Sequence, residues 1–226
     1  MPPPSSPDDA LLQQVLQQCV VHPSHMLSLL SDAAPEADPT TWEAAAAQLW
    51  DLSSDLLACR FLCAHGLHVL LVTTLDDALH RMQEAADAPR RVEVCCGVLA
   101  NLTSLACEAS YVVVQDDALA QLVVMLLGGA DGPPLCTDAA ALAEAVRLLD
   151  AAARLPQCND TCSCGWRKLL QAPWLLRCCL WLASNTLRAV LLQRWCVFFT
   201  RGVVKCFKHV DVCFLPAGIV CFLLFF

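Results

Sequence analysis

The sequence predicts an all-α fold, a solenoid of about three helical repeats followed by a hydrophobic, cysteine-rich tail. Apolar residues recur at helical spacing in the long segments before residue 157, and no run alternates with a period of two over a useful length. Similar helical blocks return after about 50 residues, which is typical of stacked helical repeats. Composition then changes abruptly, which indicates that a different kind of segment follows the repeats.

Charge and cysteine content divide the chain into two unequal parts. Residues 1–157 hold 20 acidic side chains, 6 basic side chains and 7 cysteines, whereas residues 158–226 hold 2 acidic side chains, 8 basic side chains and 9 cysteines. The net charges are −14 and +6, within a total of −8. We therefore expect a disordered start and N-terminal helices over 1–35, a repeat domain over 36–157, and an atypical basic tail over 158–226.

Eight helices are expected before residue 157, most of them bounded by residues that favour a helix terminus. They span residues 8–21, 42–52, 55–64, 67–75, 77–86, 90–107, 118–127 and 139–154. Residues 1–7 contain four prolines and are expected to be disordered. Thr40 and Glu43 have the spacing of a capping box. Gly66 and Gly128 are expected to end the helices that precede them.

The helix expected over 90–107 is apolar on nearly all sides. One stripe at helical spacing consists of Val92, Cys95, Cys96, Leu99 and Leu102. A second stripe contains Val94, Val98 and Leu105. A helix of this kind is buried on most of its surface. The helices over 118–127 and 139–154 each have one apolar face instead, so we expect them to be amphipathic.

Three blocks of the sequence resemble one another. Residues 48–53 align with residues 98–103 after a shift of 50, and residues 147–151 align with the same block after a shift of 49. Each unit contains a buried helix, a short helix, a turn and an amphipathic helix. One such hairpin has too little interior of its own, so stacking supplies the core and leaves a curved groove along the buried helices.

Two stretches resemble an armadillo repeat, namely CGVLANL at residues 96–102 and DALAQLV at residues 117–123. More narrowly, LWDLS at 49–53, FL at 61–62 and RVEVCCGVLANL at 91–102 resemble the serum amyloid A-like protein family over about residues 42–155. The resemblance implies an intracellular armadillo-like protein of the nucleus or cytoplasm with no catalytic residues. It also implies protein partners and a role in promoting cell proliferation. Members of that family are longer than this chain.

The candidate partner groove contains Asn101 and the equivalent positions Asp51 and Asp150. In armadillo repeats that bind extended peptides, an asparagine on the inner helix bonds the peptide backbone, and a tryptophan lies one turn earlier. Here the residue one turn earlier is Gly97, so the asparagine–tryptophan ladder is absent. Asn101 has two interpretations, a contact to a peptide backbone and, as we prefer, an amide that bonds within the helix packing.

No motif in the sequence points to catalysis, a metal or a cofactor, so none of these is expected. The candidate metal ligands lack the spacing of structural zinc sites; they are Cys158, Cys162, Cys164, His22 and His25. Asp76–Asp77 and Asp116–Asp117 are expected to cap helix starts, where carboxylates favour the helix dipole. The net charge of −8 argues against a nucleic-acid partner.

Three function classes remain open, and an enzyme or metal protein is the one we favour least. We favour a non-enzymatic scaffold for protein partners, with residues 158–226 outside the repeat structure. The alternative is an adaptor tethered to a membrane by residues 212–226, a run of 15 residues without a charged side chain that reaches about 22 Å as a helix against a bilayer core of about 30 Å. A stack that ended at Arg154 would leave Leu142, Val146 and Leu149 partly uncovered, so we expect a 1–157 fragment to be marginally stable or to self-associate.

Overall fold

The computed structural model describes residues 7–105, 108–128 and 134–155, together with Trp166, Leu169 and Ala172. All regular structure in this part of the chain is α-helical, which confirms the expected all-α class for these residues. The helices are α1 (Pro7–Gln18), α2 (Pro23–Asp32), α3 (Pro39–Leu52), α4 (Leu56–Ala64), α5 (Leu67–His80), α6 (Ala88–Ser104), α7 (Glu108–Gln115), α8 (Asp117–Leu126) and α9 (Ala139–Arg154).

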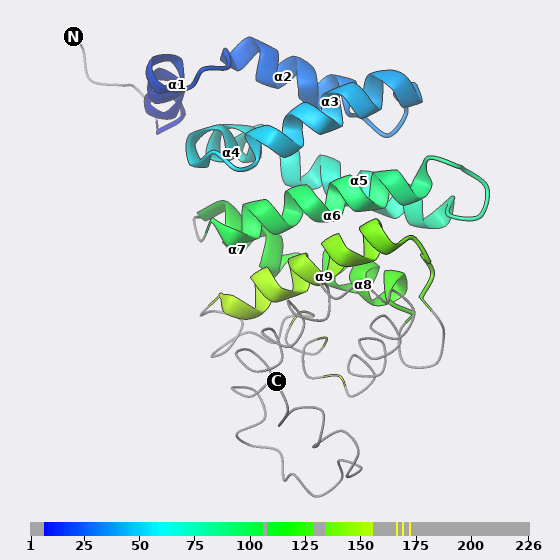
Figure 1. Ribbon diagram of the computed structural model, residues 1–226. Helices are drawn as coiled ribbons and strands as arrows, with labels where there is room; N and C mark the ends of the chain where they lie inside the picture. The colour runs from blue at the N-terminus through cyan, green and yellow to red at the C-terminus, as the bar shows by residue number, and fades with distance from the viewer. Residues whose placement is uncertain are drawn as a thin grey trace, which may run out of the picture.

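The helices follow one another down the molecule in the order of the chain (Figure 1). The long helices α3, α6 and α9 lie one beneath the next on one side, and α6 packs against both of the others. The short helices α4 and α7 follow α3 and α6, and each leads to a helix on the other side, α5 or α8. A long, a short and a further helix therefore recur in the same order.

Helix α6 lies at the centre of this arrangement. It packs against α3, α5, α7 and α9. Both expected stripes are buried along it, apart from Leu105, which caps the helix and is half-buried. Because neighbours surround the helix, the apolar residues on nearly all its sides are shielded from water, as the sequence predicts.

The helix boundaries differ from the prediction where a stronger cap competes. The helix expected to start at residue 42 begins at Pro39, and its N-cap is Asp38, which accepts hydrogen bonds from the Thr40 and Thr41 amides at 3.1 Å. The capping box predicted for Thr40 and Glu43 is therefore wrong. Asp is a strong N-cap, and proline at the first helical position loses no intrahelical hydrogen bond.

Helix α5 runs without a break from Leu67 to His80, so the two helices predicted over 67–75 and 77–86 are wrong. Asp76 and Asp77 lie near its end and not at a helix start. They pair one turn on with His80, at 3.3 Å, and with Arg81. Such i, i+4 pairs allow carboxylates near a helix C-terminus.

Other termini agree with the sequence. Asp116 accepts hydrogen bonds from the Ala118 and Leu119 amides, as expected of a cap. Gly66 and Gly128 have φ of 94° and 88°, a left-handed conformation that glycine adopts without strain. Helix α2, which begins at Pro23, was not among the expected helices. The disorder expected over residues 1–7 is wrong for Pro7, which begins α1, because proline is tolerated in the first turn of a helix. Residues 1–6 lie outside the described part.

The buried core continues past the boundary expected at residue 157. Trp166 is 0% exposed and Leu169 is 2% exposed, and both belong to the same apolar cluster as the helices. Within the described residues, no single helix is long and apolar enough to cross a bilayer. Helices α4 and α5, which are bent by 76° relative to each other, together have the length and composition of a membrane span. The anchor considered at 212–226 lies outside the described residues.

Candidate partner-binding face

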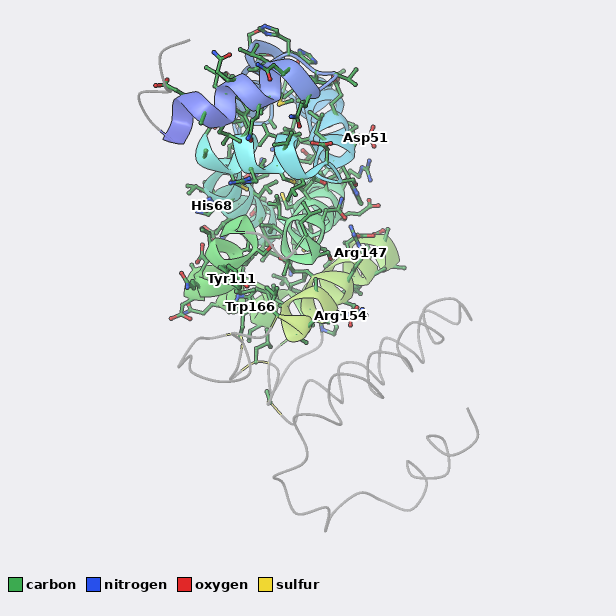
Figure 2. The ribbon with its side chains drawn as sticks, turned by 90° about the vertical axis from the view of Figure 1, so that its left-hand side faces the viewer. Asp51, His68, Tyr111, Arg147, Arg154 and Trp166 are labelled. Carbon is green, nitrogen blue, oxygen red and sulfur yellow. The ribbon has the colours of Figure 1, made fainter. Side chains whose placement is uncertain are left out.

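The three candidate groove residues lie on three helices that stack one beneath the next. Asp51 is on α3, Asn101 on α6 and Asp150 on α9. We call the polar surface of these helices the α3–α6–α9 face; it contains Glu43, Trp50, Asp51, Arg90, Glu93, Asn101, Glu144, Arg147, Asp150 and Arg154. Figure 2 shows Asp51, Arg147 and Arg154 along one edge of the molecule, on the side where these helices lie.

Asn101 joins all three helices through its side-chain amide. Its Nδ2 donates to the Ser53 hydroxyl at 2.7 Å and to the Ser54 hydroxyl at 3.5 Å, at the C-terminal end of α3. Its Oδ1 accepts a hydrogen bond from Arg147 on α9. Both ends of the amide are thus used within the chain. This geometry agrees with an amide that bonds within the helix packing, and a peptide contact would have to compete with these bonds.

Arg147 is the second bridge between α6 and α9. Its Nη2 donates to the Gly97 carbonyl at 2.8 Å, and its Nε donates to Glu144 at 2.6 Å. The guanidinium therefore bonds a carbonyl, an amide and a carboxylate at once, in the fork geometry that arginine provides. These bonds hold the register between α6 and α9.

Trp50 occupies the space above Gly97. A Cβ atom built on Gly97 would lie 2.5 Å from Cζ2 of Trp50, so a side chain at 97 and the indole in its present place are mutually exclusive. The Arg90 guanidinium lies 5.8 Å from the Trp50 ring centroid. The Trp50 indole therefore lies beside the position one turn before Asn101. It comes from α3 and not from residue 97 itself.

An ion-pair cluster lies beside this tryptophan. Arg90 donates through Nε and Nη2 to Oε1 of Glu43, at 2.9 and 2.8 Å, and through Nη1 to Glu93 at 2.7 Å. These hydrogen bonds raise the pKa of Arg90, so the group stays charged. Two carboxylates share one guanidinium, which connects α3 to α6 and leaves the cluster with net negative charge.

Asp51 and Asp150 differ in what they offer a partner. Asp51 is exposed. Asp150 pairs with Arg154, whose Nε lies 3.0 Å from Oδ1. Asp51 is therefore available for new contacts at once, while Asp150 presents a carboxylate that a neighbouring cation already shares.

A second polar cluster serves the packing. Arg91 is 2% exposed, and it donates to Asp87 at 2.7 Å and to the Pro35 carbonyl at 2.9 Å. Its guanidinium lies 4.7 Å from the ring centroid of Trp42. The hydrogen bond from Arg91, together with its charge, lowers the pKa of Asp87. Arg91 thereby ties the segment before α3 to α6.

The described residues hold no group of three side chains suited to a metal ion. His22 caps α2, and His25 bonds Gln48 at 3.0 Å. Burial raises the pKa of Cys95 to about 12 and that of Cys96 well above its usual value, so both thiols are protonated at neutral pH. Cys158, Cys162 and Cys164 lie outside the described residues.

Arg147, Trp50 and Gly97 were not among the candidate site residues, although they shape the face. One signal was available: a glycine inside a helix indicates a close approach by another group. Which group approaches depends on a neighbouring helix, and the local sequence does not specify it.

Comparison of the chain with protein-family models, with curated proteins and with solved structures gives no match. The resemblance to the serum amyloid A-like family remains a prediction that rests on the motifs alone.

Proposed function

We propose that this chain is an armadillo-like α-solenoid of about three repeats that acts as a non-enzymatic scaffold and binds protein partners along the α3–α6–α9 face. One observation carries the proposal. Helices about 50 residues apart in sequence lie next to one another. The residues Asp51, Asn101 and Asp150 are equivalent in the sequence repeat, and they lie on α3, α6 and α9, which stack in this order. A repeated polar position on stacked helices suits an extended partner.

The bonds across the face support this function because they hold it in one arrangement before a partner arrives. The bonds of Asn101 connect α3 with α9, and those of Arg90 connect α3 with α6. A surface that is already ordered loses less conformational entropy on binding. In this proposal Asn101 and Arg90 order the face, and the carboxylates of Asp51 and Asp150 contact the partner.

The charges of the face indicate the chemistry of that partner. Five carboxylates lie on it, from Glu43, Asp51, Glu93, Glu144 and Asp150, against three guanidinium groups, from Arg90, Arg147 and Arg154. The excess favours a segment that offers hydrogen-bond donors and positive charge. The resemblance to the serum amyloid A-like family, which the motifs of residues 49–53 and 91–102 carry, implies a role in cell proliferation, in the nucleus or cytoplasm.

Affinity capture with the full chain tests the proposal when charge reversals on opposite sides are compared. Asp51→Lys changes the proposed face, and Asp76→Lys makes the same change on α5, behind α6 (Figure 1). We expect a set of proteins that the unmodified chain and Asp76→Lys retain and that Asp51→Lys loses. Each of these should then bind the unmodified chain as a purified protein. Equal capture by all three chains would contradict the use of this face.

A further inference from the structure

The end of the stack carries an apolar flank on α9. Each helical residue turns the side chain by about 100°, so Leu142, Val146 and Leu149 lie roughly 100–160° around the helix from Arg147. Arg147 is 30% exposed and bonds α6 from the polar edge of α9, so these three side chains lie away from that edge. We call them the outer flank of α9.

The outer flank is covered in the folded chain. Leu142, Val146 and Leu149 are 2%, 9% and 2% exposed. Among the described helices, α6 is the one with which α9 makes its most extensive contact.

Leu155 directly follows α9 and is buried, and beyond it the described residues that enter the core are Trp166 and Leu169. Trp166 is among the largest fully buried side chains, and Leu169 belongs to the same apolar cluster. Figure 2 shows Trp166 at the lower end of the described stack, near the level of Arg154. Neither residue lies on one of the nine helices of the described part, so a further segment contributes to this core.

We infer that the outer flank of α9 is an intramolecular docking surface and that its occupant is the chain's own segment around Trp166 and Leu169. Trp166 and Leu169 would then shield the outer flank of α9 from water. The partner-binding face lies on a different side of α9, so this inference does not depend on the proposed function.

The reach of the chain and its charge both favour this occupant. Eleven residue steps separate Leu155 from Trp166, which extend to about 36–40 Å. Helix α9 has 16 residues and is about 24 Å long, so Trp166 is able to return to any part of it. The net charge of +6 on residues 158–226 also complements the −14 of residues 1–157.

Photo-crosslinking in the full chain tests the docking directly. A photoreactive phenylalanine analogue replaces Trp166, and the same analogue replaces the 43% exposed Val112 on α7 as the matched control. We expect crosslinks from position 166 to the peptide that contains Leu142–Leu149, and none from position 112 to that peptide. In a mixture of isotopically light and heavy chains, these crosslinks should join residues of one chain. Crosslinks between chains, or none to this peptide, would overturn the inference.

Hydrogen exchange provides an independent readout. We expect Trp166→Ala to speed exchange of the α9 amides at least tenfold, while the α3 amides and the Val112→Ala control stay unchanged. Should Trp166→Ala unfold the whole chain, the milder Trp166→Phe is compared in its place, with a smaller change confined to α9. Unchanged α9 exchange in the folded variant would show that another group covers the outer flank.

Discussion

Replacing Gly97 by alanine tests the packing of Trp50 against α6. The substitution acts in two opposite ways. Alanine favours a helix interior over glycine by about 1 kcal/mol. Its Cβ, however, would lie 2.5, 2.7 and 2.9 Å from three atoms of the Trp50 indole, far inside the 3.5–4.0 Å that carbon atoms prefer.

The indole has to move by about 1 Å to relieve this overlap, and it is held on both sides. Arg90 lies 5.8 Å from the ring centroid, and the ring also packs against the core. Overpacking of this kind costs about 1–3 kcal/mol. We therefore expect Gly97→Ala to lower the free energy of unfolding by about 0–2 kcal/mol in the unmodified chain, after the helix preference of about 1 kcal/mol is subtracted.

A double-mutant cycle separates the two effects. In a Trp50→Ala background no indole opposes the new methyl group, so Gly97→Ala should raise the free energy of unfolding by about 1 kcal/mol. Urea unfolding of the four chains gives a coupling energy, which we expect to be about 1–3 kcal/mol. A coupling below about 0.5 kcal/mol, within the usual additivity of distant sites, would refute the contact.

Three further predictions concern buried groups. Arg91→Met should lower the free energy of unfolding by about 3 kcal/mol in urea, because the Asp87 carboxylate and the Pro35 carbonyl lose their donor. The pKa of Asp87 is lowered in the folded state, so its contribution to stability is complete above about pH 4 and is lost as the pH falls further. The difference in urea midpoint between the unmodified chain and Asp87→Asn should accordingly be present at pH 6 and become smaller as the pH falls below about 4. Cys95 and Cys96, buried and protonated, should resist alkylation at pH 8 until urea unfolds the chain, as peptide mass spectrometry would show.

Helical periodicity predicts much of this fold because the driving force is local in sequence. The helix over 139–154 has the predicted bounds, and α6 was recognised from apolar residues on nearly all its sides. Errors occur where two local signals compete. Asp76 and Asp77 are residues typical of a helix start. Here they pair with His80 and Arg81 one turn later, and the helix continues past both aspartates. Sequence position alone does not show which partner a carboxylate will have.

The sequence repeat predicts which helices carry the three candidate residues, but not which groups these residues bond. The 50-residue repeat places Asp51, Asn101 and Asp150 on equivalent helices, which the structure puts in succession. The partners of Asn101 come from 46 to 48 residues away. A tryptophan that fills the space of a glycine on another helix, as Trp50 does at Gly97, likewise depends on how two helices are placed in space.

The polar side-chain bonds that connect α3, α6 and α9 fix how these helices are aligned along one another. Apolar contacts between helices are not directional, and one helix could slide along another at little cost in buried area. The bonds from Ser53 to Asn101 and from Asn101 to Arg147 are satisfied in one register only. Each contributes about 1 kcal/mol to stability, yet together they fix the spacing between Asp51 and Asp150. These few bonds therefore contribute little to the stability of the fold but largely determine the register of the helices. The register in turn sets the spacing of the carboxylates that an extended partner would meet.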